Sequence, residues 1–298
     1  FELANKEISS WDGYESTPLH SLSDLASDNG VSLIAYKDES HRFSLKSFKA
    51  LGGAYAVANL LIKKLKEQGI EAKSSDLIAG TYSKITSKIT VCCATDGNHG
   101  RSVAWGAQKF GCNCEIYIHR TVSVAREEAI AKYGAIVNRI NGNYDESVHI
   151  AAEVSESKGY YVVSDTSYEG YTDIPKDVMQ GYTVMVDEAM KQMEELPTHV
   201  FLQGGVGGFP AAVVSFLVES LECPPIFVVV EPTNADCLFQ SAVNGEPTVV
   251  HGDLDTIMAG LACGEVSLLA WPILESYVSH FLSIQDDSIS KTMQPLAN

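Results

Sequence analysis

Apolar residues recur every three or four positions between residues 49 and 68, which predicts a long amphipathic helix there. The repeat consists of Leu51, Ala54, Val57, Leu60, Leu61 and Leu65. An apolar run at 31–36 precedes this helix and predicts a strand. The polar stretch 73–88 is rich in Ser, Thr and Lys and predicts a loop. Residue 49 therefore lies where an apolar strand gives way to a helix.

From residue 89 onward, short apolar runs alternate with amphipathic segments. The runs predict strands at 89–94, 114–118, 136–140, 160–163, 200–202 and 226–230. The segments between and after them predict helices at 97–110, 124–133, 144–157, 177–195, 210–219 and 235–243. Short apolar strands separated by helices are typical of parallel sheets covered on both faces. The sequence therefore predicts an α/β fold.

The link at 73–88 and a turn at 172–175 divide this alternation into two doubly wound parallel-sheet domains. We expect residues 1–88 and 175–298 to form a larger domain, with a smaller domain of residues 89–174 inserted in it. The last segment, 267–281, predicts a helix. Because the second sheet is still incomplete at residue 298, we expect a C-terminally truncated fold.

Composition and charge narrow the class of protein. The chain has 298 residues, of which 45% are hydrophobic and 20% charged, as in ordinary soluble domains. No apolar run approaches the length of a membrane span, and the N-terminus has no signal-peptide pattern, so we expect a cytoplasmic protein. The net charge of −17 argues against nucleic acid or an anionic membrane as partner. The seven cysteines lack zinc-site spacing, and we expect no metal.

Lys49 is a candidate nucleophile. A lysine at the start of a helix lies against the positive end of the helix dipole, which disfavours its protonated form. A lysine amine in that state suits the formation of a Schiff base. The alternative is a solvated residue of the first helical turn, without chemistry.

Two turns add candidate anion sites. Residues 95–100, Thr-Asp-Gly-Asn-His-Gly, join a predicted strand to a helix and aim backbone N–H groups at one point, with Asp96 as a potential base. The alternative is an ordinary turn that Asp96 or Asn98 caps. Residues 203–208, Gln-Gly-Gly-Val-Gly-Gly, fit a phosphate loop, although a glycine-rich turn without ligand is the alternative. A reactive lysine, an Asn-bearing turn and a glycine loop together suit pyridoxal 5′-phosphate.

Several motifs resemble one enzyme family over nearly the whole chain. They are Ser10-Trp11-x-Gly13-Tyr14, Thr17-Pro18-Leu19, Lys37-Asp38-Glu39-Ser40-x-Arg42-Phe43, Ser47-Phe48-Lys49-Ala50-Leu51-Gly52-Gly53, Ala94 to Gly100, Asp165-Thr166-x-x-Glu169-Gly170-Tyr171, Glu231-Pro232 and Thr256 to Glu265. The chain resembles the fold-type II pyridoxal phosphate enzymes of the tryptophan synthase β family and, among them, the diaminopropionate ammonia-lyases. Asp96 is the discriminating residue, because the neighbouring threonine and serine dehydratases usually have Ser there.

The resemblance implies a role for each matching residue. It implies that Lys49 is the Schiff-base lysine and that Asp96 and Asp165 are the catalytic acid/base pair. It implies that the cofactor is bound by Phe48, Lys49, Asn98, Gly205, Val206, Gly207 and Gly208. It implies that the substrate is bound by Thr95, Asp96, Gly97, His99 and Tyr168. Gly204 and Gly208 stand where members often have Ala and Ser, and Tyr168 where Trp is common.

The implied reaction is α,β-elimination of 2,3-diaminopropionate to pyruvate and ammonia, by a homodimer. The residues that meet the pyridine nitrogen in this family lie beyond residue 298. For Asp96 and Asp165 to act as bases near neutral pH, we expect their pKa values to be raised.

The alternatives are a serine or threonine dehydratase of the same fold, a catalytically inactive pyridoxal phosphate-binding relative and, least supported, a nucleotide-binding module. Cys237 and Cys263 flank family motifs, where a disulfide or a close thiol pair is an open alternative.

Overall fold

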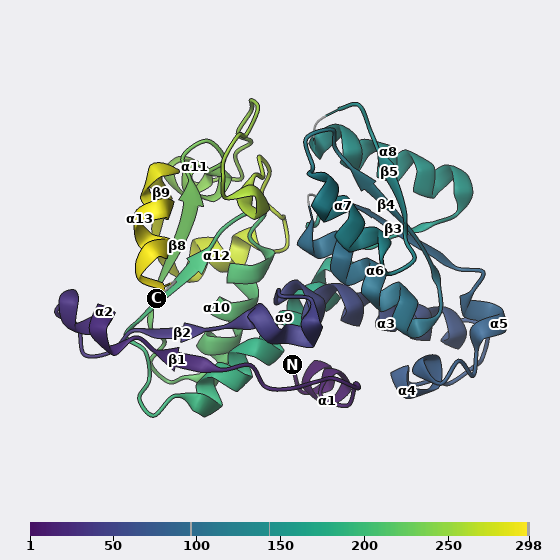
Figure 1. Cartoon of the computed structure of the whole chain (residues 1–298), viewed down its shortest axis with the longest axis horizontal. Helices are drawn as coiled ribbons and strands as arrows, with labels where there is room; N and C mark the ends of the chain where they lie inside the picture. Colours follow the sequence, from purple (N-terminus) through teal and green to yellow (C-terminus); the bar gives the residue numbers. More distant parts are fainter. Residues whose placement is uncertain (96, 143, 297–298) are drawn as a thin grey trace. The chain divides into compact units, whose positions relative to one another are not determined.

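The structure is a computed structural model that describes residues 1–95, 97–142 and 144–296. Its chain contacts divide it into two compact units (Figure 1). Unit 1 contains Phe1–Tyr14 and Ser47–Tyr182, and unit 2 contains Glu15–Lys46 and Thr183–Asn298. The predicted domain boundaries after residues 88 and 174 remain a prediction.

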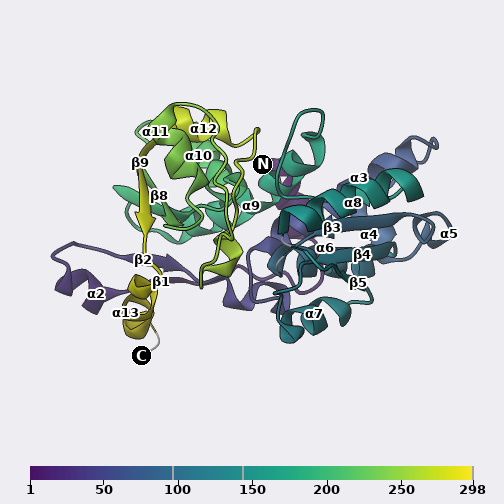
Figure 2. The ribbon, with the colours of Figure 1, turned by 90° about the horizontal axis from the view of Figure 1, so that it is seen from above.

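Unit 1 is built on a parallel sheet of strand order β5-β4-β3-β6. Its strands are β3 (Thr90–Ala94), β4 (Asn113–Ile118), β5 (Ile136–Arg139) and β6 (Tyr161–Val162). Its helices are α1 (Glu2–Ile8), α3 (Lys49–Lys66), α4 (Ser74–Ile78), α5 (Ser83–Thr86), α6 (Asn98–Phe110), α7 (Val124–Ala131), α8 (Tyr144–Lys158) and the first half of α9 (Asp173–Gln192). Helices α6 and α7 cover one face of the sheet and α8 covers the other (Figure 2).

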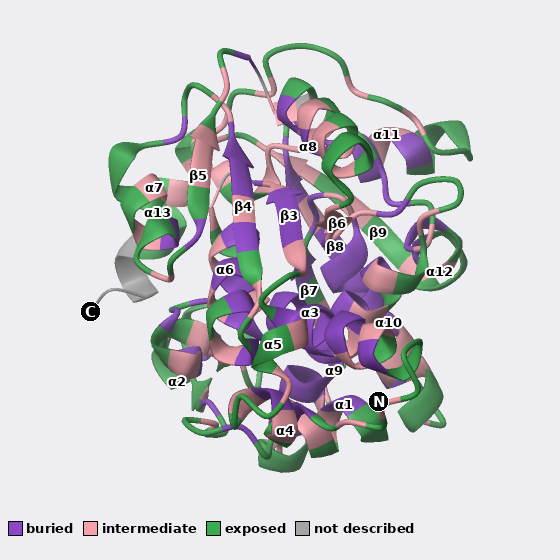
Figure 3. Cartoon of the chain, turned by 90° about the vertical axis from the view of Figure 1, so that its right-hand side faces the viewer, coloured by how far each residue is buried: buried purple, intermediate pink, exposed green. Residues whose placement is uncertain are grey.

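The core of unit 1 lies along β3 and β4 and between α3 and α6 (Figure 3). Small residues let these two helices approach closely. A Cβ added to Gly106 of α6 would lie 2.8 Å from Ala54 Cα of α3, and one added to Gly53 would lie 2.4 Å from Ser102 Oγ. These contacts fix the start of α3, and therefore Lys49, against the sheet that carries the 95–100 turn.

Unit 2 contains a parallel sheet of order β7-β8-β9 and an antiparallel pair, β1-β2. The strands are β1 (Leu19–Ser21), β2 (Ala35–Lys37), β7 (His199–Gln203), β8 (Ile226–Pro232) and β9 (Val278–Ile284). The helices are α2 (Ser23–Asp28), the 3-10 turns η1 (Glu39–Ser44) and η2 (Ala259–Leu261), the end of α9, α10 (Gly208–Ser220), α11 (Cys237–Asn244), α12 (Trp271–Tyr277) and α13 (Asp287–Leu296).

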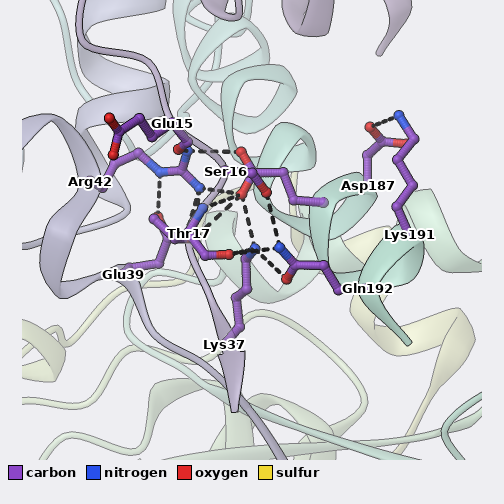
Figure 4. A network of polar contacts seen from close by, with 10 residues as sticks. Glu15, Ser16, Thr17, Lys37, Glu39, Arg42, Asp187, Lys191 and Gln192 are labelled. Atoms are coloured by element: carbon purple, nitrogen blue, oxygen red, sulfur yellow. Dashed lines mark hydrogen bonds and ion pairs between the residues drawn. The ribbon is translucent and has the colours of Figure 1, made fainter. Parts of the chain in front are cut away.

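A buried ion-pair network ties the N-terminal segment of unit 2 to α9 (Figure 4). Arg42 is only 1% exposed, and its Nη2 lies 2.6 Å from Glu188 Oε2 and 2.8 Å from Glu39 Oε1. Lys37 Nζ lies 2.9 Å from the same Glu188 oxygen. Because every charge in this group faces an opposite one, the network offsets the cost of burying the guanidinium.

The two parallel sheets confirm the predicted α/β class, but four predicted elements are wrong in part. Stretch 73–88 is not a loop, because α4 and α5 form there, and Asp76 Oδ2 accepts the Lys73 N–H at 2.9 Å. The predicted helix 267–281 is α12 followed by strand β9, since a short apolar run does not distinguish the two by periodicity. Within 31–36, strand β2 begins only at residue 35. Helix α9 begins at Asp173, because Pro175 fits the first helical turn.

Candidate active site

Lys49 is the first residue of α3 and lies among groups of unit 1. Its Nζ forms a short ion pair with Asp165 Oδ2 and lies 5.6 Å from the ring centroids of both Phe48 and Tyr182. Ser102 Oγ of α6 donates to the Lys49 carbonyl at 2.6 Å and holds the backbone in place. The side chain is only 22% exposed. The lysine is therefore a fixed, half-buried amine, and the alternative of a solvated first-turn residue is wrong.

Asp165 follows β6, and a buried histidine stands behind it. His99 Nδ1 lies 3.8 Å from Asp165 Oδ2, while Nε2 donates to the Val163 carbonyl at 2.8 Å. Nδ1 has no hydrogen-bond partner among the described residues. The Nε2 bond fixes the ring so that Nδ1 faces the carboxylate. His99 thus faces the carboxylate that pairs with Lys49, and its predicted contact with the substrate remains a prediction.

The pKa of Asp165 is shifted in the direction opposite to the predicted one. Burial alone raises this pKa, but the charges of His99 and Lys49 and the hydrogen bond from Lys49 outweigh burial. Together they hold the pKa of Asp165 well below its ordinary value. The expectation of a raised pKa was wrong because it did not include the opposite charge of the lysine itself.

The 95–100 turn opens α6 inside unit 1. Thr95 is buried, and its Oγ1 accepts the N–H groups of Gly97 at 3.0 Å and Gly100 at 3.1 Å. Asn98 is exposed and its Oδ1 accepts from Arg101 Nη2 at 3.0 Å. The threonine hydroxyl thus shapes the turn, and the Asn98 side chain stays accessible. The predicted base Asp96 lies outside the described residues.

The loop that carries Asp165 is anchored by a tyrosine that sequence reasoning missed. The Tyr171 hydroxyl donates to the Val162 carbonyl at 2.9 Å and accepts the Ser164 N–H at 3.0 Å. The Tyr171 ring also stacks on that of Tyr168, with centroids 4.8 Å apart, and Tyr168 is 44% exposed. The aromatic residue after Glu169-Gly170 was the only signal for this anchor in the sequence. The predicted substrate contact of Tyr168 remains a prediction.

The glycine loop of unit 2 connects β7 to α10. Gly205 and Gly207 have φ angles of +79° and +97°, a backbone conformation that favours glycine. A Cβ on Gly207 would lie 3.1 Å from Leu274 Cδ1, and one on Gly204 would lie 2.4 Å from Glu231 Cγ. Gly207 is the N-cap of α10 and provides no side-chain cap. The loop therefore presents the positive end of a helix dipole without side chains in the way, which fits a phosphate group.

Cys237 and Cys263 both lie near this loop. Cys237 Sγ lies 3.6 Å from the Gly205 carbonyl oxygen, and a Cβ on Gly205 would lie 3.9 Å from Cys263 Sγ. Burial strongly raises the pKa of the Cys237 thiol. In the structure both side chains pack near the glycine loop.

Among the described residues, no group of three or more His, Cys, Asp or Glu side chains is arranged to hold a metal ion. No helix in the described part is long and apolar enough to cross a membrane.

Comparison with known proteins identifies the class of enzyme. A family profile described as "Pyridoxal-phosphate dependent enzyme" matches residues 11–298. The chain belongs to this family, and pyridoxal phosphate is its cofactor. The predicted fold-type II class is confirmed with it. A half-buried lysine at a helix start and a side-chain-free glycine loop are groups of this chain that fit the aldehyde and the phosphate of that cofactor.

Further similarity places the chain within that class. Diaminopropionate ammonia-lyase of Escherichia coli K12 is 44% identical over 290 residues, which are 96% of this chain and 72% of the relative. The structure of the selenomethionine-labelled holo form of the E. coli lyase has a TM-score of 0.91 and 40% identity, covering 100% of this chain and 74% of that one. Its complex with an aminoacrylate-PLP azomethine reaction intermediate has a TM-score of 0.88, 40% identity and the same coverage. Among pyridoxal phosphate enzymes, the chain therefore belongs to the diaminopropionate ammonia-lyases.

Proposed function

We propose that this protein converts 2,3-diaminopropionate to pyruvate by α,β-elimination, releasing both nitrogen atoms as ammonia and consuming one water. The observation that carries the proposal is the pairing of Lys49 with Asp165 in a half-buried site backed by His99. A lysine that can release and rebind a carbonyl carbon, next to a carboxylate that can move a proton, is what this elimination requires.

Each residue has a defined task in this proposal. When bound, pyridoxal phosphate delocalises the negative charge that develops at the substrate Cα. Asp165 takes the Cα proton of one enantiomer, and Asp96 takes that of the other. Lys49 then takes up this proton from the carboxyl group and donates it to the departing β-amino group, since an amine leaves readily only when protonated. Gly205, Val206, Gly207 and Gly208 hold the phosphate, and the 95–100 turn holds the substrate carboxylate.

The charge state of Lys49 controls the strength of Asp165 as a base. While the lysine carries its proton, it keeps the pKa of Asp165 low, so the carboxylate is ionised but weakly basic. Loss of the lysine charge removes one of the causes that lower this pKa, and burial then raises it. The carboxylate therefore becomes a stronger base at the step in which the lysine amine is no longer a cation.

The proposal is tested by measuring pyruvate formation from D- and L-diaminopropionate, L-serine and L-threonine. We expect the highest kcat/KM with a diaminopropionate enantiomer. Higher activity with serine or threonine would favour a dehydratase, and no pyruvate from a chain that binds the cofactor would favour an inactive relative. Lys49→Ala is the matched control, and we expect a loss of at least about 1000-fold in kcat.

The covalent assignment is tested separately. Borohydride reduction of the cofactor-loaded protein, followed by peptide mass spectrometry, is expected to place the pyridoxyl label on Lys49. Label on Lys46 or Lys63 instead would overturn the assignment of the lysine.

We also propose a cytoplasmic homodimer with the predicted domain boundaries after residues 88 and 174. The family resemblance supports the dimer, and the sequence pattern around residues 73–88 and 172–175 supports the boundaries. Light scattering after size-exclusion chromatography is expected to give twice the chain mass, and a monomer would contradict the proposal.

A further inference from the structure

Glu231 is a fully buried carboxylate of unit 2 that the proposed reaction does not use. It lies near the end of β8 with 0% exposure. Its Oε2 accepts the Phe239 N–H at 2.8 Å and its Oε1 accepts the Leu238 N–H at 3.2 Å. These are two of the first N–H groups of α11, whose own N-cap residue Asp236 provides no side-chain cap. Glu231 therefore caps this helix from the neighbouring strand.

The same side chain lies against the glycine loop. A Cβ on Gly204 would lie 2.4 Å from Glu231 Cγ and 3.1 Å from Oε1, so the backbone of the loop packs directly on this carboxyl group. The Gly204 N–H donates to the Val230 carbonyl at 2.9 Å, which holds the loop to the strand that carries Glu231.

The helix turn that Glu231 caps supports the rest of the loop. Cys237 Sγ lies 3.6 Å from the Gly205 carbonyl oxygen. Leu238 Cδ2 would lie 3.2 Å from a Cβ on Gly207. One carboxylate thus contacts the beginning of the loop and, through Cys237 and Leu238, fixes the turn on which Gly205 and Gly207 rest.

We propose that Glu231 is a positioning residue for the cofactor phosphate: it holds the first turn of α11 against Gly204–Gly207 and sets the direction of the loop N–H groups. This inference rests on the assignment of the 205–208 loop to the phosphate under the proposed function. It adds a residue that touches neither the phosphate nor the substrate and acts through the loop.

The chemistry of the capping contact explains why a carboxylate is needed. Two N–H groups donate to two different oxygens, and a carboxyl group offers an oxygen acceptor to each of them. Glutamine has the same shape, but its amide NH₂ would face one of the two donors. Burial raises the pKa of Glu231 to about 8, while the two N–H donors and the Cys237 thiol lower it and Asp236 raises it.

The test compares two ligands that differ only in the phosphate. The purified protein is freed of cofactor with hydroxylamine and titrated with pyridoxal 5′-phosphate and with pyridoxal, following the absorbance of each. For Glu231→Gln we expect the Kd of pyridoxal 5′-phosphate to rise about tenfold or more, because loop N–H groups aimed away from a charged acceptor bind it less tightly. The Kd of pyridoxal is expected to change by less than about twofold.

Two further variants keep the test decisive. Ser241→Ala is the matched control, since Ser241 is equally buried in α11 and its hydroxyl bonds to the Cys237 carbonyl at 2.6 Å and the Thr248 N–H at 2.8 Å, both outside residues 203–208. We expect it to leave the Kd ratio of the two ligands unchanged. If Glu231→Gln does not fold, Glu231→Asp retains both oxygens with a shorter reach and is expected to show a smaller loss, again confined to the phosphate ligand.

The outcomes separate this inference from the proposed function. The role of Glu231 is overturned if Glu231→Gln weakens the binding of both ligands equally or of neither. The proposed function still stands in that case if the wild type prefers pyridoxal 5′-phosphate and forms pyruvate. A wild type that binds both ligands equally overturns the assignment of the loop, and with it this inference.

Discussion

At the scale of single residues, the proposed function depends on the neighbours of one lysine. Lys49 and Asp165 are 116 positions apart in the chain, and the fold brings their charged atoms into contact. The aromatic rings of Phe48 and Tyr182 lie beside the amine, each with its centroid 5.6 Å from Nζ. The lysine is held by a carboxylate that can also accept a proton, so under the proposed function one contact serves both positioning and catalysis.

Replacing Asp165 by Asn is expected to make stability less dependent on pH in the acid range. The pKa of Asp165 is lowered in the folded state, so the carboxylate stabilises the fold above its ordinary pKa of about 3.9, and this contribution is lost as the pH falls toward the folded value. The difference in unfolding free energy between wild type and Asp165→Asn should therefore be largest near pH 7 and shrink below about pH 4. Urea unfolding at a series of pH values measures it.

Asp173→Asn is the control for this measurement, because Asp173 pairs with Lys63 on the surface, where the two side chains are 82% and 62% exposed. A surface pair of this kind contributes little. If Asp165→Asn and Asp173→Asn gave the same pH dependence, the coupling between Asp165 and Lys49 would be contradicted.

At the scale of elements, glycines in α3 determine where Lys49 is placed. A Cβ on Gly52 would lie 2.5 Å from Tyr182 Cε1 and 2.6 Å from the Val178 carbonyl oxygen of α9. A Cβ on Gly181 would in turn lie 2.4 Å from the Leu51 carbonyl oxygen. The first turn of α3 therefore contacts the α9 backbone directly, and any side chain there would push Lys49 away from its partners.

Gly52→Ala tests this close approach. The obstructing atom of Val178 belongs to the backbone and cannot easily move aside, so we expect the unfolding free energy to fall by about 1 to 3 kcal/mol. In an unobstructed helix, the same change from glycine to alanine normally raises the unfolding free energy. Differential scanning calorimetry measures the change. Lys63→Ala, on the exposed side of the same helix, should change stability by no more than about 0.5 kcal/mol. Equal stability of Gly52→Ala and wild type would contradict the packing.

At the scale of the whole molecule, the chain is organised in two units with separate cores. Unit 1 carries Lys49, Asp165 and the 95–100 turn, and unit 2 carries the glycine loop and its support. Unit 2 is assembled from two segments distant in sequence, and the Arg42 network joins them (Figure 4). The network therefore holds the two segments of unit 2 together, a structural role that no local sequence pattern predicted.

Arg42→Ala is expected to destabilise unit 2 by about 3 to 5 kcal/mol, because it leaves Glu188 buried without its main counter-charge. Lys191→Ala is the matched control on α9, the helix that carries Glu188. Lys191 pairs with Asp187 at 2.7 Å but is 70% exposed, so its loss should cost less than about 1 kcal/mol. Chemical denaturation of both variants provides the comparison, and similar losses would show that burial of the network contributes nothing.

The sequence by itself determined the features that repeat locally. The alternation of apolar strands and amphipathic helices after residue 89 predicted two parallel sheets, because burial on both faces dictates that pattern. The positive φ angles of Gly205 and Gly207 could be anticipated from a run of glycines. Strand β9 could not, since a short apolar segment fits a strand or a helix equally well until a partner strand such as β8 is present.

Only the tertiary structure decided which side chains meet. The contact between Lys49 and Asp165, the cap that Glu231 provides to α11, and the burial of Arg42 all join residues that no periodicity relates. The direction of the Asp165 pKa shift followed from such a contact, and the sequence predicted the opposite. Local patterns set which segments are buried, whereas charges and hydrogen bonds depend on distances of a few ångströms between distant parts of the chain.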